Sequence, residues 1–213
     1  MNNKRILYRK YENTDYEICE SLVNGAWKFD DNFKPQELAN IAKCMYTKGS
    51  VIGSNFRRVV EVDGNVVGFI FGKNEGSVNK LKSILFGLDI MRRIMFVGGM
   101  QYAKKKKLYS AINAHQINRY KLVGEGKSEI VLFVVDPKHH GFGYGKQLLS
   151  DFIGFCRESD VKSIIVETNK AGASSFYEGV GFKLIGDFDS PLHEYASKDG
   201  QACMYEYCCK PKI

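Results

Sequence analysis

Three glycines alternate with aromatic residues in one stretch of this chain, His140-Gly141-Phe142-Gly143-Tyr144-Gly145. The apolar, β-branched run at residues 131–135 precedes it and ends at Asp136-Pro137, which predicts a buried strand. An amphipathic pattern from Lys146 onward predicts a helix. Glycines allow a ligand to approach the backbone closely, and the first N–H groups of a helix attract an anion. The stretch therefore predicts a cradle for a ligand that carries a pyrophosphate, unless the glycines only turn the strand into the helix.

Two familiar phosphate-binding loops do not fit this spacing. A Walker loop requires G-x-x-x-x-G-K-[ST], but Gln147 follows Lys146, and no glycine lies five residues before Gly145. A dinucleotide fingerprint requires G-x-G-x-x-G, and Lys146 stands where its third glycine would fall. The sequence excludes both loops.

The glycine stretch instead resembles the acetyl-coenzyme A motif of the GNAT superfamily of N-acetyltransferases, [QR]-x-x-G-x-[GA] after a central strand. His140 stands where that family prefers glutamine or arginine, so one side-chain donor near the phosphates is missing while the backbone amides remain. Residues 169–182 are similar to the second signature of the family, roughly N-x-x-A-x-x-x-Y-x-x-x-G-F. Ala173, Tyr177 and Gly181-Phe182 keep its spacing, but Asn169 lies one residue too far upstream, with Gly172 as the extra residue.

The resemblance implies catalytic roles for two residues. Glu129, fourteen residues before Gly143, matches a glutamate that acts as general base through water in the histone-modifying members. Tyr177 matches the tyrosine that hydrogen-bonds or protonates the departing thiolate of coenzyme A. Glu167, at the end of the next predicted strand, is a rival base. Each residue also has a non-catalytic interpretation. Glu129 is then a solvated carboxylate at a strand edge, and Tyr177 is one of twelve tyrosines, placed on an amphipathic helix face.

The same resemblance implies where acetyl-coenzyme A lies. Its pantetheine arm pairs with the backbone of residues 133–135 like a missing strand, the backbone N–H of Val134 or Val135 stabilises the oxyanion, and no metal is needed. The expected contacts with the coenzyme are Phe133, Val134, Val135, His140, Gly141, Phe142, Gly143, Tyr144, Gly145, Lys146, Asn169 and Phe176.

The elements before the glycine stretch follow from local patterns. Residues 6–9 predict a first strand, Thr14 or Asp15 caps a first helix, and Pro35 opens a second helix that ends near Gly49. The aromatic residues between these helices, Trp27, Phe29 and Phe33, belong either to the core or to the acceptor wall. Residues 56–62 and 66–71 predict a hairpin, because Asp63-Gly64 is the strongest short hairpin signal.

Residues 74–127 depart from the family, which joins these strands by a far shorter link. Two helical patterns occupy the insertion, one through Leu81, Ile84, Leu85, Leu88, Met91 and Met95 and one over residues 101–121, and Gly98-Gly99 separates them. Between residues 79 and 123, ten lysines or arginines and one acid make a net charge of +9, against +7 for the whole chain. The basic insertion either attracts an anionic partner or is a solvated surface.

After the cradle, residues 161–167 predict a strand, a short helix contains Phe176 and Tyr177, and residues 183–188 and 202–209 predict a closing hairpin. His193 and Tyr195 in the loop of this hairpin either touch the acceptor or are exposed loop residues without a role.

Composition sets the outer limits. The 213 residues suit one domain spanning 1–213, and 44% apolar with 26% charged residues is typical of a folded globular protein. We expect a cytoplasmic protein, because we find neither a secretory signal nor about 18 consecutive apolar residues. The six cysteines form no C-x-x-C pair, which disfavours zinc.

We expect one α/β domain with a central mixed sheet flanked by helices and a basic helical insertion between its third and fourth strands. The expected activity is transfer of acetyl from acetyl-coenzyme A to a primary amine of a small molecule, peptide or protein in a ternary complex. The alternative is a non-catalytic module that senses acyl-coenzyme A and binds a polyanion or acidic partner through the insertion. The acceptor, acyl length and oligomeric state cannot be read from the sequence.

Overall fold

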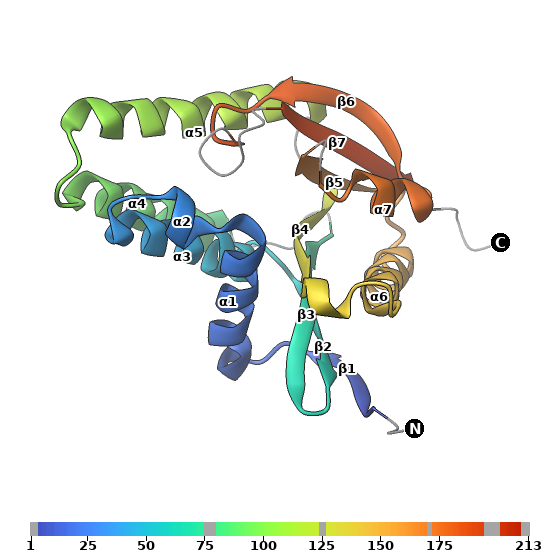
Figure 1. Ribbon diagram of the computed structural model, residues 1–213. Helices are drawn as coiled ribbons and strands as arrows, with labels where there is room; N and C mark the ends of the chain where they lie inside the picture. The colour runs from blue at the N-terminus through green and yellow to red at the C-terminus, as the bar shows by residue number, and fades with distance from the viewer. Residues whose placement is uncertain (1–3, 75–79, 124–126, 170–171, 194–200, 210–213) are drawn as a thin grey trace.

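The computed structural model describes residues 4–74, 80–123, 127–169, 172–193 and 201–209, so Tyr195 lies outside the described residues. Within these residues seven strands form one mixed sheet with the order β1-β2-β3-β4-β5-β7-β6 (Figure 1). The strands are β1 (Ile6–Lys10), β2 (Phe56–Val62), β3 (Asn65–Lys73), β4 (Ser128–Val135), β5 (Ser163–Asn169), β6 (Lys183–Asp189) and β7 (Gln201–Cys208). The expected α/β fold with a central mixed sheet is confirmed.

Both predicted hairpins are present. β2 pairs antiparallel with β3 through a turn in which Asp63 and Gly64 have φ of 52° and 85°, as a two-residue hairpin turn requires. β6 pairs antiparallel with β7 at the other edge of the sheet. The pairing of β4 with β5 is parallel.

Helices cover both faces of this sheet. They are α1 (Tyr16–Trp27), α2 (Phe29–Asn32), α3 (Gln36–Ile52), α4 (Lys80–Phe96), α5 (Tyr102–Val123), α6 (Tyr144–Glu158) and α7 (Ser174–Gly179), with short 3-10 turns η1 (Asn13–Asp15) and η2 (Pro137–His139). Ile70 of β3 packs in a core with α6, whereas its neighbours Phe69 and Phe71 pack in a second core with α1 to α5. The side chains of a strand alternate between its faces, and this alternation builds the two cores.

The expected end of the second helix near Gly49 is wrong. α3 continues to Ile52, and the carbonyl of Gly49 accepts a hydrogen bond from Gly53 N. A Cβ at Gly49 would lie 3.0 Å from the Phe86 ring of α4. Gly49 therefore lets α4 pack closely against α3, which a pattern within one helix cannot reveal.

The insertion between β3 and β4 contains the two predicted helices, α4 and α5, and Gly99 with φ of 69° lies in the turn between them. Lys105 Nζ donates to the carbonyls of Met95 and Val97 at the end of α4, at 2.6 and 2.8 Å. α4 packs on α3, and α5 returns above it to pack on β6 (Figure 1). The insertion thus joins the N-terminal helices to the C-terminal hairpin.

A bulge divides β4 into two parts. Ile130 pairs with Gly72 and Leu132 with Phe71, so Val131 is an extra residue in the ladder with β3. On the other side, β4 pairs with β5 only from Ser128 to Ile130. Beyond the bulge the two parallel strands diverge, and this divergence opens the site described below.

None of the helices in the described ranges combines the length and apolar content that a bilayer span requires.

At Gly72 the sheet and α6 approach each other closely. A Cβ there would lie 2.3 Å from the ring of Phe152, which is fully buried. We expect Gly72→Ala to lower the free energy of unfolding by about 1–3 kcal/mol, as overpacked core substitutions do. Urea unfolding measures the change.

Gly154→Ala in α6 is the matched control, because no atom lies within 4 Å of its added Cβ. Alanine is the better helix former, so this variant should gain roughly 0.5–1 kcal/mol. Equal stability of the two variants would contradict the close approach of α6 to β3.

Candidate functional site

A cleft of about 710 Å³ lies where β4 and β5 diverge. Its lining comes from α1, α3, β3, α5, β4, β5, α7 and the segment after β6. Five residues that the sequence marked as coenzyme contacts or catalytic candidates line it: Glu129, Phe133, Glu167, Asn169 and Tyr177. The cleft therefore brings residues of the second signature together with β4, whereas residues 140–145 are not part of its lining.

The glycine loop starts α6 beside this cleft. Gly141 and Gly143 have φ of 82° and 83°, a conformation that favours glycine, and Gly143 is the N-cap of α6. A Cβ at Gly145 would lie 3.3 Å from the ring of Phe133, so the first turn packs against β4. The first N–H groups of a helix have no acceptors within the helix. The loop and helix therefore have the geometry of an anion cradle.

His140 has a structural contact in this loop. Its Nε2 donates to the carbonyl of Val135 at 2.8 Å and ties the loop to the end of β4. A glutamine or arginine at this place would offer a longer donor. His140 is therefore engaged with the backbone of the protein, and the backbone amides of the loop remain the predicted phosphate contacts.

Tyr177 and Asn169 come from the second signature. Tyr177 is buried between Phe176 and Phe182, with ring centroids 5.4 Å from each, and burial raises the pKa of its phenol. The phenol is thus protonated at neutral pH. Gly172 is the extra residue of the signature, and a Cβ there would lie 1.9 Å from Asn169 Oδ1. The absence of a side chain at Gly172 therefore leaves room for the side chain of Asn169.

Glu129 is held by two cations. Lys73 Nζ of β3 lies 2.8 Å from its carboxylate, and Arg119 of α5 donates to its other oxygen. Only 13% of the Glu129 side chain is exposed. The alternative of a solvated carboxylate at a strand edge is therefore wrong, and the bulge places Glu129 on the same face as Leu132 and Val134.

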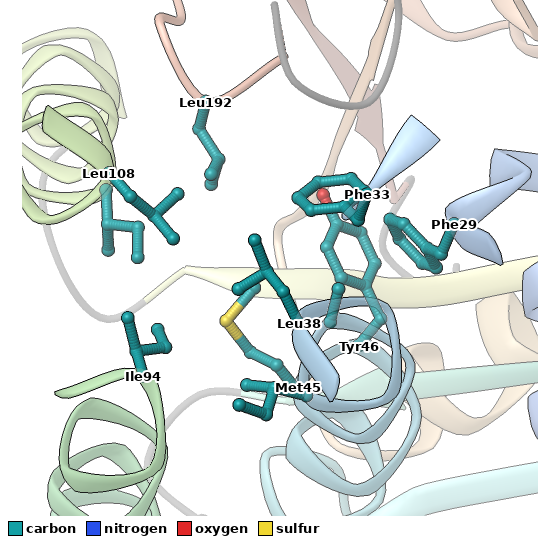
Figure 2. Close-up of a pocket in the computed structure, with 11 residues that line it drawn as sticks. Phe29, Phe33, Leu38, Met45, Tyr46, Ile94, Leu108 and Leu192 are labelled. Carbon is teal, nitrogen blue, oxygen red and sulfur yellow. The ribbon is translucent and has the colours of Figure 1, made fainter. Parts of the chain in front are cut away.

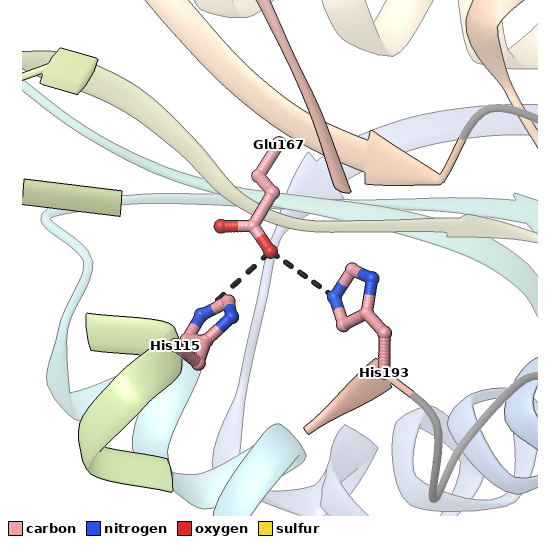
Figure 3. Close-up of side chains that lie close together, drawn as sticks. All are labelled: His115, Glu167 and His193. Carbon is pink, nitrogen blue, oxygen red and sulfur yellow. Dashed lines mark ion pairs between the residues drawn. The ribbon is translucent and has the colours of Figure 1, made fainter. Parts of the chain in front are cut away.

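Arg119 also donates a hydrogen bond to Glu167 of β5, from Nε to Oε2 at 3.1 Å. His193 Nε2 lies 3.1 Å and His115 Nε2 3.7 Å from Oε1 (Figure 3). Burial works to raise the pKa of Glu167, but the hydrogen bond from His193 and the nearby positive charges outweigh it and lower the pKa. Burial lowers the pKa of His115, which keeps that imidazole neutral.

Sequence reasoning missed Arg119 and His115 as site residues, because both fall within the basic helical pattern of the insertion. It left His193 between an acceptor contact and an exposed residue, and the second alternative is wrong, since His193 is half-buried against Glu167. His115, Glu167 and His193 are far apart in the sequence, so their spacing along the chain does not predict that they meet.

An apolar cavity of about 20 Å³ adjoins the cleft, large enough for a methyl-sized group (Figure 2). Met45, Tyr46, Ile112 and Leu192 line both spaces. Phe29 and Phe33 are buried at the cavity, whereas Trp27 lines the cleft. The aromatic residues between the first two predicted helices therefore serve both the core and the wall of the site.

Comparison with known proteins agrees with this geometry. A family model described as an acetyltransferase (GNAT) domain matches residues 86–189. An N-acetyltransferase from Staphylococcus aureus Mu50 is 14% identical with a TM-score of 0.57, covering 97% of this chain and 99% of that one. The ribosomal-protein-S18-alanine N-acetyltransferase from Escherichia coli is 12% identical with a TM-score of 0.54, covering 98% and 97%.

The Salmonella typhimurium protein yncA, whose structure contains its cofactor acetyl-coenzyme A, is 14% identical with a TM-score of 0.53, covering 98% of this chain and 96% of that one. No curated protein matches the sequence. At these identities the solved structures establish the fold, which is that of an acetyltransferase. In addition, residues 86–189 are similar to the GNAT acetyltransferase domain that the family model describes.

Arg119 offers a test of the site, because it is the cation shared by two carboxylates. Its side chain is 18% exposed, so its removal leaves Glu129 and Glu167 facing each other with little solvent. We expect Arg119→Met to lower the free energy of unfolding by about 2–4 kcal/mol, near the range for breaking a buried ion pair. Urea unfolding at neutral pH measures it.

The control is Arg92→Met, since Arg92 pairs with Asp89 at the surface of the same insertion with 65% of its side chain exposed. That change should cost less than about 1 kcal/mol. Equal losses in the two variants would mean that Arg119 does not hold the diverging strands together.

Proposed function

We propose that this protein is an N-acetyltransferase that transfers acetyl from acetyl-coenzyme A to a primary amine of a small molecule, peptide or protein. The observation that carries the proposal is the divergence of β4 and β5 beside the glycine loop, with Tyr177 lining the resulting cleft. The similarity of residues 86–189 to a GNAT acetyltransferase domain and the acetyl-coenzyme A in the yncA structure support it. The reaction is a direct attack of the amine in a ternary complex.

The coenzyme would be held mainly by backbone groups. The amides of residues 141–146 face the pyrophosphate at the start of α6, and the edge of β4 at residues 133–135 pairs with the pantetheine arm as an added strand. The backbone N–H of Val134 or Val135 stabilises the oxyanion on the thioester carbonyl. Phe176 packs beside Phe133, with ring centroids 5.7 Å apart, and Asn169, which lines the cleft, contacts the pantetheine arm or its carbonyls.

Tyr177 acts as the acid. The amine nitrogen attacks the thioester carbonyl carbon, a C–N bond forms, the C–S bond breaks, and the departing thiolate takes the phenolic proton. The proton that the nitrogen loses as the amide forms returns to the phenolate. The buried phenol is protonated at neutral pH, so its proton is available when the thiolate forms. The position of Tyr177 in the cleft supports this role.

Glu129 acts as the base through water and removes a proton from the ammonium form of the acceptor. Lys73 and Arg119 keep its carboxylate oriented in the cleft. Glu167 is the rival, because it lines the same cleft and its lowered pKa keeps it ionised and able to accept a proton.

Isothermal titration with acetyl-coenzyme A tests the proposal most directly, with NADH as the control ligand. We expect low-micromolar binding of acetyl-coenzyme A alone, typical of an enzyme and its substrate, roughly 1 μM to 1 mM. Gly143→Val should weaken binding at least tenfold, because a side chain strains the N-cap of α6 at its φ of 83°. Gly154→Ala, elsewhere in α6, should bind normally, and no binding by the unaltered protein would refute the proposal.

Tyr177→Phe tests the chemistry. With a panel of primary amines and detection of released thiol, turnover should fall roughly ten- to ten-thousand-fold while acetyl-coenzyme A binding stays within about twofold. Unchanged turnover would remove Tyr177 from the mechanism.

Glu129→Gln should slow turnover in the same assay, whereas a loss confined to Glu167→Gln would assign the base to Glu167.

A further inference from the structure

Three side chains converge in the cleft. His115 comes from α5, Glu167 from β5 and His193 from the segment after β6 (Figure 3). One ligand atom of each lies within 4.8 Å of the others, and all three residues line the cleft. Both imidazoles present Nε2 to the same carboxylate oxygen, Oε1.

Two of the three spacings between these atoms are close to those of a metal site, and the third, between the two imidazoles, is at most 4.8 Å. Ligands at about 2.0–2.2 Å from a tetrahedral zinc ion lie roughly 3.3–3.5 Å from each other. The distances from Glu167 Oε1 are 3.1 Å to His193 Nε2 and 3.7 Å to His115 Nε2. The second distance is too long for a hydrogen bond, so a direct hydrogen bond does not explain why His115 Nε2 faces the carboxylate.

Neighbouring residues orient two of the three groups. The fully buried Ser190 places its Oγ 2.9 Å from His115 Nδ1, which leaves Nε2 to face the cluster. Arg119 Nε occupies Glu167 Oε2 and leaves Oε1 toward the histidines. Metal-binding histidines and carboxylates are commonly held by such partners.

The charges nearby are balanced without an ion. Lys73 and Arg119 offset Glu129 and Glu167, so these four side chains leave no excess positive charge to repel a cation. Two imidazoles and one carboxylate form a set typical of zinc, whereas calcium and magnesium prefer oxygen ligands throughout.

We propose that His115, Glu167 and His193 bind one zinc ion, with the remaining coordination position open to the cleft. A water molecule or a lone pair of the acceptor completes the coordination there, as in zinc sites with three protein ligands. This inference goes beyond the proposed acetyl transfer, and its test requires neither acetyl-coenzyme A nor an acceptor.

Zinc titration of chelator-treated protein, followed by desalting and elemental analysis, tests the site. We expect about one zinc per chain, bound at least about tenfold more weakly by His193→Ala and by Glu167→Gln, since each loses a ligand. His139→Ala is the matched control, because His139 lies on η2, outside the cluster, and should bind zinc normally.

Cobalt(II) replaces zinc as a spectroscopic probe and separates this site from the thiols of the chain. Visible bands of four-coordinate cobalt without a thiolate charge-transfer band support the proposal. This spectrum is recorded on the unaltered protein, so it tests the site even if a ligand variant fails to fold. Absence of zinc binding, equal binding by the His193→Ala and His139→Ala variants, or a thiolate band would each overturn it.

Discussion

The guanidinium of Arg119 links β4 and β5 at the point where these two strands diverge. β4 and β5 diverge after three paired residues, and each carries a buried carboxylate, Glu129 and Glu167, on the face toward α5. Two such carboxylates would repel each other in a poorly solvated space. Arg119 donates to both, so the insertion supplies the one cation that the two carboxylates share.

The insertion is therefore part of the site as well as a basic surface. α4 packs on α3 while α5 packs on β6, which brings Ile112, His115 and Arg119 to the cleft. Some of its positive charge has local partners, because Arg92 and Arg93 pair with Asp89 and Lys105 binds the end of α4. An anionic partner for the remaining charge stays a prediction. Several apolar residues of α4, including Leu81 and Leu88, are exposed, and Ile90 and Ile94 face the core.

Local signals predicted the elements well. Asp63-Gly64 marked its hairpin because that turn needs residues that tolerate positive φ, and Gly98-Gly99 separated two helices whose periodicity was already visible. Gly49 misled the prediction of a helix end, because its role is contact with Phe86 of another helix. Glycine is enriched both at helix ends and at close packing, and a single sequence does not separate the two uses.

By itself the sequence determined the order of strands and helices, the glycine cradle and the spacing that resembles the GNAT signatures, because these depend on neighbours along the chain. Only the tertiary structure decided which way Glu129 points, since the bulge at Val131 shifts the alternation of β4. It also decided that His115, Glu167 and His193 meet. Contacts between residues so far apart in the chain arise from the packing of α5 against the C-terminal hairpin, which no local pattern records.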